Sequence, residues 1–364
     1  MSEEITLKTI SEIVSQAMGR RASDIHLVPG ARILLRVDGV LEPLSEECLA
    51  VFAVEQMLSS LLTDTQKEQL EKSGELVFVH ECDGYRIRSG VFRQRGTYAM
   101  SLRLLPQEIP EPKELGLPEP LVALSHRRRG LILVTGESGC GRTTTLASLT
   151  AEAARVVPRT VVTLDAPIEY RHPQGSSLIL QREIGADSAS YETALRMARW
   201  QDANVIEVGD LPDEAAIEAA LDAAESGHLV LAGLAVDCVE AAIERVTAGT
   251  SSRHQERLRI QLSEVFAGIV TQRILPRQVS DRHPNAFGRI PAFELLISNT
   301  ATRRMIRTGN VEQLPSVLKA GRERGMQSMD DAIYELYTKS DISEETAIAY
   351  ARDPGGMRQK LKLL

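Results

Sequence analysis

Short runs of consecutive apolar residues recur through the second half of the chain. The clearest are GLILVTG (130–136), TVVTLDAP (160–167), NVIEVGD (204–210) and HLVLAGLA (228–235). Runs of this length without polar alternation are typical of strands that are buried on both faces. Stretches with helical periodicity, such as 191–200 and 213–226, separate them. Alternating strands and helices predict a parallel sheet with right-handed crossover connections.

The first hundred residues follow a different pattern, in which apolar and polar residues alternate over short stretches. The segments 31–44 and 74–105 each predict strands joined by tight turns. The turns fall at the dipeptides Asp38-Gly39, Asp83-Gly84 and Arg95-Gly96. An amphipathic helix is expected over residues 4–18. Together these elements predict a small N-terminal α+β domain with a largely antiparallel sheet.

A proline-rich segment, residues 106–120, separates the two patterns and is the clearest linker. It divides an N-terminal domain (1–105) from an α/β core (121–295) and a helical C-terminal region with a tail (296–364). Beyond about residue 238 the pattern predicts mostly helix. The last ten residues, GGMRQKLKLL, predict a loose tail.

The composition is that of a globular protein, with 43% hydrophobic and 25% charged residues. A net charge of −8 argues against electrostatic nucleic-acid binding, so no nucleic-acid partner is expected. No stretch reaches the roughly 18 apolar residues of a transmembrane helix, and the start, MSEEITLKTI, lacks an apolar signal region. We therefore expect a cytoplasmic protein without membrane insertion, which would meet any membrane partner from the cytoplasmic side. The four cysteines are far apart, which argues against a zinc site.

Residues 136–145, GESGCGRTTT, lie between an apolar run and a predicted helix. They match the phosphate-binding pattern G-x-x-x-x-G-K-[ST] except at its Lys, which is Arg142 here. Backbone N–H groups and a helix N-terminus bind phosphate in such loops, and Gly139 and Gly141 would allow its close approach. Thr143 would offer its hydroxyl to Mg²⁺. We predict ATP binding through Gly136, Glu137, Ser138, Gly139, Cys140, Gly141, Arg142, Thr143 and Thr144.

Further motifs occur along nearly the whole chain. They are ASDIHL (22–27), RVDG (36–39), RGLILVTG (129–136), APIEYRHP (166–173), ALRMARWQDANVIEVGDLPD (194–213), AAESGHLVLAGLA (223–235), QRILPR (272–277), ATRRMIRT (301–308) and GMQSMDDAIYELY (325–337). In sequence and order these segments resemble the PilT family of type IV pilus retraction ATPases, within the type II/IV secretion ATPase superfamily.

The resemblance implies an α/β fold in which an N-terminal PAS-like α+β domain precedes a RecA-like P-loop ATPase domain with a helical C-terminal region. In that family six subunits form a ring, so a homo- or hetero-hexamer with PilT-like subunits is expected. The ring docks on an inner-membrane pilus platform protein and drives the pilus retraction of twitching motility. Arg88, Arg95 and Arg103 match arginines with which the N-terminal domain completes the ATP site.

The resemblance also assigns roles to single residues of the core. Asp165 and Glu169 lie in the segment that matches the family's Asp box, and Asp210 takes the place of the Walker B acid. Asp210 and Thr143 would hold Mg²⁺. His228 matches the first histidine of the His box and would sense the γ-phosphate. With the three arginines, these residues are the catalytic candidates.

The chain departs from the family pattern at positions that carry the chemistry. Arg142 replaces a compact Lys with a wider, planar head group. The Walker B glutamate is shortened to Asp210, and a displacement of about 1 Å can cost a water-positioning acid roughly a hundredfold in rate. The other changed positions are Ala166 (an acid of the Asp box), Pro212 (an arginine), Ala235 (the second histidine) and Glu207 (an apolar residue of a buried strand).

Three hypotheses follow for the function. The favoured one is a nucleotide-binding ring subunit with weak or lost ATP hydrolysis, a pseudo-ATPase that modulates an active paralogue. The alternative is a functional but slow pilus retraction ATPase. A type II secretion or pilus assembly ATPase is less favoured, because those proteins carry a paired-cysteine module. Two side chains within the segment 194–213 complete the expectations. Trp200 should pack against the fold, and Glu207 implies either a less enclosed strand or a buried partner.

Overall fold

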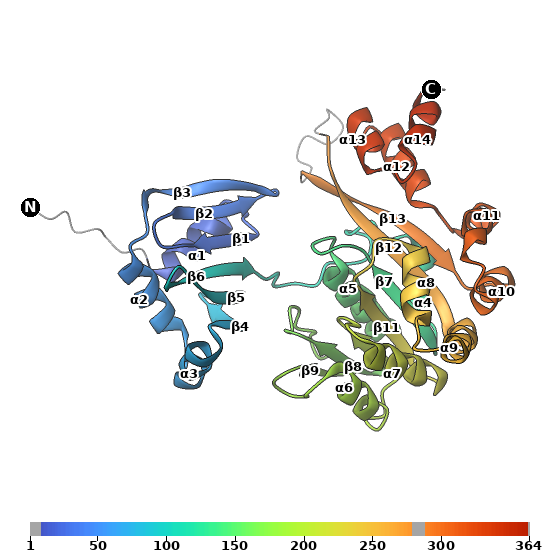
Figure 1. The fold of residues 1–364 in the computed structure, drawn as a ribbon, viewed down its shortest axis with the longest axis horizontal. Coiled ribbons are helices and arrows are strands. Elements are labelled where there is room, and N and C mark those ends of the chain that lie inside the picture. The colour runs from blue at the N-terminus through green and yellow to red at the C-terminus, as the bar shows by residue number, and fades with distance from the viewer. Residues whose placement is uncertain (1–8, 279–287, 363–364) are drawn as a thin grey trace, which may run out of the picture. The chain divides into compact units, whose positions relative to one another are not determined.

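The computed structural model describes residues 9–278 and 288–362. The chain forms two compact units that divide between Glu108 and Ile109, within the proline-rich segment (Figure 1). Each unit has its own sheet and its own hydrophobic core. Within the described ranges, no helix is long and apolar enough to cross a membrane.

The N-terminal unit is a six-stranded antiparallel sheet in the order β3-β2-β1-β6-β5-β4, packed against helices α1 to α3. The three predicted turns are confirmed, because each glycine and the residue before it have the positive φ of a type I′ turn. Helix α1 begins after a Thr9–Glu12 capping box, so the helix predicted over 4–18 is observed from Ile10; residues 4–8 lie outside the described part. The elements are α1 Ile10–Gly19, β1 Asp24–Leu27, β2 Arg32–Val37, β3 Val40–Cys48, α2 Val51–Leu61, α3 Asp64–Ser73, β4 Glu75–Cys82, β5 Tyr85–Gln94 and β6 Thr97–Leu104.

The second unit is built on a seven-stranded sheet in the order β13-β12-β7-β11-β10-β8-β9, in which only β13 runs antiparallel to its neighbour. The strands are β7 Gly130–Thr135, β8 Thr160–Asp165, β9 Leu178–Glu183, β10 Val205–Val208, β11 Leu229–Leu234, β12 Phe266–Pro276 and β13 Arg289–Ile297. The helices are α4 Glu119–Ser125, α5 Arg142–Val156, α6 Tyr191–Ala198, α7 Glu214–Glu225, α8 Val239–Thr247, α9 Ser252–Val265, α10 Thr300–Thr308, α11 Leu314–Ala320, α12 Met329–Thr338, α13 Glu344–Tyr350 and α14 Pro354–Leu361.

Helices cover both faces of this sheet, which explains why its strands are continuous apolar runs. Leu131 and Leu133 of β7 face the layer that contains α6 to α10, whereas Ile132 and Val134 face α4 and α5. Because β7, β8, β10 and β11 are parallel, their carboxyl ends lie at one edge of the sheet. The predicted phosphate-binding loop, residues 136–141, follows β7 at that edge.

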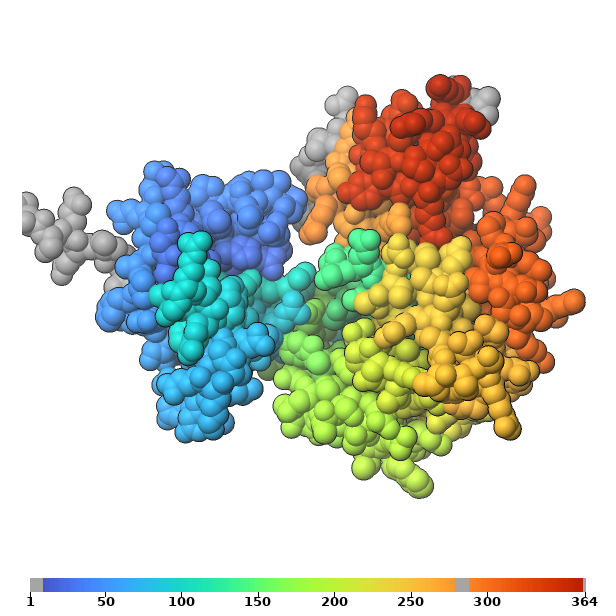
Figure 2. Space-filling view, viewed as in Figure 1, coloured from blue at the N-terminus to red at the C-terminus, as the bar shows by residue number. Residues whose placement is uncertain are grey.

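The region beyond residue 238 is mostly helical, as predicted, but β12 and β13 also lie there and extend the sheet, which the pattern did not predict. Two expectations about this unit are wrong. The last residues are not loose: α14 begins at the Asp353 cap and buries Met357 and Leu361, with only 363–364 outside the described part. Figure 2 shows the C-terminal helices, coloured red, gathered as one body at the surface. Trp200 does not pack, since it is 86% exposed just after α6.

Candidate functional site

The phosphate-binding loop has the backbone conformation that its glycines predict. Gly136, Gly139 and Gly141 all have positive φ, at 144°, 80° and 91°. A Cβ atom at Gly136 would lie 2.4 Å from the Cys140 Sγ and 2.5 Å from the Gln272 carbonyl oxygen, so only glycine fits there. Such a turn into the first residue of a helix forms an anion-binding concavity of backbone N–H groups. The loop therefore has the geometry of a phosphate site.

Side chains from two distant segments anchor this loop and its helix. The Gln272 amide of β12 donates to the Cys140 carbonyl at 2.6 Å and accepts from the Thr145 hydroxyl at 2.9 Å. The Thr144 hydroxyl lies 2.9 Å from the Tyr170 hydroxyl, in the segment after β8. Sequence reasoning missed Gln272 and Tyr170 as site residues, although both lie in motifs that carry the family resemblance.

Several described side chains have a buried polar atom without a hydrogen-bond partner, and two of them belong to predicted site residues. They are Nη1 of Arg142, the first residue of α5, and Oδ1 of Asp210, which follows β10. A buried polar atom of this kind is available to bind a ligand. Glu137, Ser138 and Gly139 are exposed, and Thr143 is half-buried. A nucleotide phosphate and Mg²⁺ fit this donor set, with Thr143 and Asp210 as the residues that would hold the metal.

The strand-end group, defined as Asp165, Asp210 and Ala235, lies at the carboxyl ends of β8, β10 and β11. Burial raises the pKa of Asp165 to about 7, and the nearby carboxylates of Glu169 and Glu183 add to this rise. The pKa of Tyr191 is also raised, by burial first and then by the charges of Asp165 and Asp210. The structure therefore brings the predicted Asp165, Glu169 and Asp210 into one acidic neighbourhood.

Of the two expectations for Glu207, the structure shows the buried neighbour. Its Oε2 lies 3.7 Å from Nε2 of His172, and both side chains are almost fully buried. Burial raises the pKa of Glu207 to about 8, with a further contribution from Asp165, and lowers that of His172 to about 4. Although the distance is that of an ion pair, both groups are neutral at pH 7 by these values. We therefore interpret the contact as one between two uncharged groups.

His228 lies at the wrong edge of the sheet for its predicted role. It immediately precedes β11, where its carbonyl accepts from Gly130 at the start of β7 and its Nδ1 donates to the Ala203 carbonyl at 2.6 Å. The loop follows the other end of β7, roughly 20 Å away at about 3.3 Å per strand residue. A γ-phosphate sensor cannot act over this distance, so the assignment of His228 is corrected. The second histidine position, Ala235, is at the loop edge but holds no imidazole.

The three predicted arginines of the N-terminal unit, Arg88, Arg95 and Arg103, do not lie close together. Arg88 and Arg103 face each other directly across β5 and β6. Arg95 occupies the turn of the same hairpin with a φ of 47°, about 20 Å from that pair at the usual strand rise. The role of the three arginines in completing a nucleotide site stays a prediction.

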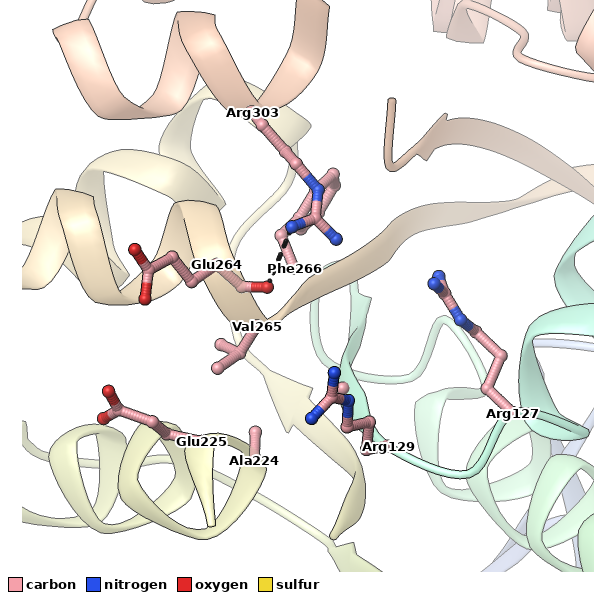
Figure 3. A pocket seen from close by; sticks show the side chains of 9 residues that line it. Arg127, Arg129, Ala224, Glu225, Glu264, Val265, Phe266 and Arg303 are labelled. Carbon is pink, nitrogen blue, oxygen red and sulfur yellow. Dashed lines mark hydrogen bonds between the residues drawn. The ribbon is translucent and has the colours of Figure 1, made fainter. Parts of the chain in front are cut away.

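A cavity of about 310 Å³ lies at the start of β7 and β12 and is lined partly by arginines. Figure 3 shows Arg127, Arg129 and Arg303 directed toward one hollow, while the carboxylates of Glu225 and Glu264 point away from it. Arg303 donates to the Glu264 carbonyl at 3.0 Å. Because this cavity is at the opposite edge of the sheet from the loop, it is separate from the phosphate site.

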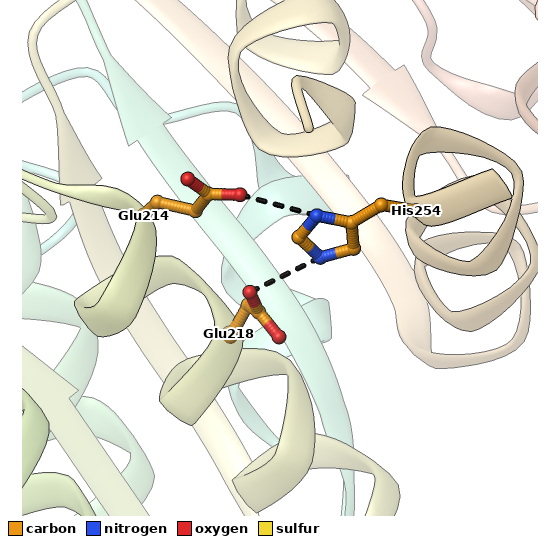
Figure 4. A group of neighbouring side chains, drawn as sticks. All are labelled: Glu214, Glu218 and His254. Atoms are coloured by element: carbon orange, nitrogen blue, oxygen red, sulfur yellow. Dashed lines mark ion pairs between the residues drawn. The ribbon is translucent and has the colours of Figure 1, made fainter. Parts of the chain in front are cut away.

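A histidine and two glutamates join α7 to α9 on the surface (Figure 4). Nδ1 of His254 lies 3.3 Å from Glu214 and its Nε2 lies 3.2 Å from Glu218. The two ring nitrogens face different carboxylates, so one metal ion could not use both contacts as they stand. Arg257 already pairs with Glu218 at 2.5 Å. We interpret the group as an ion-pair contact between the helices.

Comparison with known proteins agrees with this geometry. A model of the type II/IV secretion system protein family matches residues 1–345. The chain belongs to that family. The type IV pilus retraction ATPase PilT of Pseudomonas aeruginosa is 31% identical over 346 residues, covering 95% of this chain and 98% of the relative. The resemblance to PilT-like ATPases is therefore confirmed.

Two further similar proteins are a second pilus ATPase, PilU, and a PilT of known structure. The type IV pilus ATPase PilU of Pseudomonas aeruginosa is 30% identical over 342 residues, covering 94% of this chain and 88% of that protein. A crystal structure of the pilus retraction motor PilT with bound ADP superposes with a TM-score of 0.85 at 37% identity. It covers 97% of this chain and 99% of the PilT chain. The expected fold class is therefore confirmed, since the match extends over both units.

Proposed function

We propose that this family member is a PilT-like motor protein of the type IV pilus that binds nucleotide and hydrolyses ATP weakly or not at all. One observation carries the proposal: the phosphate-binding loop has the backbone geometry of a phosphate site, whereas the strand-end group holds an aspartate and an alanine where the family resemblance implies a glutamate and a histidine. The bound ADP in the similar PilT structure supports nucleotide binding.

The retained residues suit binding. The loop backbone would hold the phosphates, and the buried Nη1 of Arg142 is a free donor for a phosphate oxygen. Thr143 and Asp210 would hold Mg²⁺, which would neutralise phosphate charge when bound. None of these roles needs a strong base or a mobile imidazole.

The altered residues suit hydrolysis poorly. Asp210 carries its carboxylate one methylene further back than a glutamate, Ala166 supplies no acid, and Ala235 supplies no imidazole. Each removed group that stabilises phosphoryl transfer costs about ten- to a thousandfold in rate, and such losses do not add simply. His228 does not replace Ala235, because it lies at the opposite edge of the sheet.

The cellular role follows from the relatives. PilT and PilU are pilus ATPases, and we propose that this chain forms a ring with itself or with an active PilT-like paralogue. In such a ring it would act at the cytoplasmic face of the inner membrane, against a pilus platform protein, and would modulate retraction. Arg88 and Arg103, opposed on one sheet, would then meet the phosphates or acids of a nucleotide site.

The test is a parallel measurement of Mg-ATP binding and turnover by wild type, Arg142→Lys, and Arg142→Lys with Asp210→Glu. We expect binding in all three, turnover at least about a hundredfold below that of an intact-motif relative in wild type, and a gain in the double variant. Wild-type turnover close to the relative's would overturn the proposal in favour of a retraction ATPase. Absence of binding in every variant would leave only a scaffold role.

The slow retraction ATPase is the second candidate, because Thr143 and the buried, unpartnered Oδ1 of Asp210 still offer a metal site. It predicts steady turnover that is lost in Asp210→Asn. A secretion or pilus assembly ATPase is less favoured, since the four cysteines form no pair.

A further inference from the structure

Gln272 carries a polar amide group in the middle of β12, and only 2% of the residue is exposed. Both ends of its amide are used on the phosphate-binding loop and helix α5, as donor to the Cys140 carbonyl and as acceptor from Thr145. Its own backbone carbonyl closes the space beside Gly136. Gln272 thus contacts the loop at its beginning and its end, and α5 in its first turn.

The hydrogen bond to Cys140 fixes the direction of a peptide group that matters for phosphate. In a planar trans peptide the C=O and the following N–H point in opposite directions. Because the Cys140 carbonyl is directed toward Gln272, the N–H of Gly141 is directed away from β12. Gly141 follows with a φ of 91°, a conformation in which glycine tolerates rotation of the preceding peptide. Without an anchor, this peptide could turn its carbonyl oxygen toward an incoming phosphate.

We propose that Gln272 is a positioning residue that holds the Cys140–Gly141 peptide with its N–H available to phosphate. The inference deepens the proposed nucleotide binding and rests on it. It names a second determinant of the site, 132 residues distant in sequence, that acts through the loop backbone and does not touch nucleotide itself.

The chemistry of the position selects an amide. Methionine and leucine are apolar side chains of similar size, and neither can donate to the Cys140 carbonyl or accept from Thr145 as an amide does. The neighbouring Thr271 offers a matched control, because it is equally buried but bonds Thr135 of β7 at 2.7 Å and leaves the loop alone.

The experiment compares Gln272→Met, Gln272→Leu and the control Thr271→Val with wild type in the full-length protein. Hydrogen exchange of the amides of residues 138–142 is measured without nucleotide, and ADP affinity is measured by calorimetry. Removing one partner of a buried hydrogen bond predicts about tenfold or greater acceleration of loop exchange, and about tenfold weaker ADP binding, in both Gln272 variants. Thr271→Val should stay within about twofold of wild type in both measurements.

Each outcome is decisive. Loop exchange that is unchanged in Gln272→Met, at equal global unfolding midpoint, would overturn the positioning role. Equal acceleration in Thr271→Val would also overturn it, because the effect would then come from general loosening of β12. If wild type binds no ADP, the proposed function fails, and the nucleotide-free loop exchange still decides the role of Gln272. If Gln272→Met does not fold, Gln272→Leu supplies the comparison.

Discussion

The phosphate-binding loop and the strand-end group lie at the same edge of one sheet. The loop would act through its backbone, whereas the strand-end group would act through its side chains. The loop relies on backbone N–H groups and on Gly136, which no other residue can replace because a Cβ there would lie 2.4 Å from the Cys140 sulfur. The strand-end group relies on the tips of side chains, which substitution can remove without disturbing the fold. A motor site can therefore lose catalysis and keep binding, because the two functions rest on separable features.

The largest effect is expected from Gly136→Ala. The new Cβ would overlap the Cys140 sulfur and the Gln272 carbonyl, in a backbone conformation with a φ of 144°. We expect loss of nucleotide binding by about a hundredfold or more and a fall of roughly 2–4 kcal/mol in unfolding free energy. Gly139→Ala is the control, since its Cβ would meet open space and only its positive φ is strained, for about 1 kcal/mol. Equal losses in the two variants, in calorimetry and thermal unfolding, would contradict a steric need for glycine at 136.

The second effect concerns the buried Glu207 beneath the strand-end group. The unfolded chain loses this proton near its ordinary pKa of 4.5, whereas the folded chain keeps it to about pH 8. Across that window the folded state binds more protons, so stability falls as pH rises, by about 2 kcal/mol between pH 6.5 and 8 from this group. His172 opposes the trend only below pH 6.5, where its lowered pKa makes stability rise with pH.

Chemical denaturation at pH 6.5 and 8 checks this expectation. Glu207→Leu and Glu207→Gln should both flatten the decline, because neither side chain titrates. The exposed Glu256→Gln should leave it as in wild type. A decline that persists in both Glu207 variants would assign it to Asp165, whose pKa is also raised.

Much of this architecture is readable from sequence because its signals are local. The loop glycines, the apolar strands and the three hairpin turns depend on neighbouring residues, and each is confirmed. β12 was missed because its apolar run, FAGIVTQRILP, follows directly on α9 without a turn signal. Gln272 and Tyr170 reach the loop through tertiary contacts, which no local pattern reports.

The role predicted for His228 was wrong for a different reason. The loop follows the run 130–135, whereas His228 precedes the run 229–234, and parallel strands put those two positions at opposite edges. The order of the histidine and its strand in the sequence therefore already argued against this role, although the motif match suggested it. Trp200 was expected to pack on hydrophobicity alone, but it follows the last turn of α6 with no element over it among the described residues.

A smaller effect separates the two histidine positions. In the background Arg142→Lys with Asp210→Glu, we expect Ala235→His to raise ATP turnover about tenfold, since it restores a side chain at the loop edge. His228→Ala in the same background should leave turnover within about twofold and cost about 1 kcal/mol through its lost bond to Ala203. A larger loss of turnover in His228→Ala would return His228 to the site.

The smallest effect is expected from Trp200→Ser. With 86% of the residue exposed, the substitution should change unfolding free energy by less than about 0.5 kcal/mol. Nucleotide affinity should also be unchanged, which makes this variant a baseline for both regions. A destabilisation above 1 kcal/mol in thermal or chemical unfolding would show that the side chain packs after all.

The separation of binding from catalysis is tested most directly by one preparation of wild-type protein in which ADP affinity and single-turnover hydrolysis of Mg-ATP are measured together. The account predicts saturable ADP binding that Gly136→Ala abolishes, with hydrolysis below about one hundredth of that of an intact-motif relative. Hydrolysis close to the relative's rate, with binding retained, would contradict it.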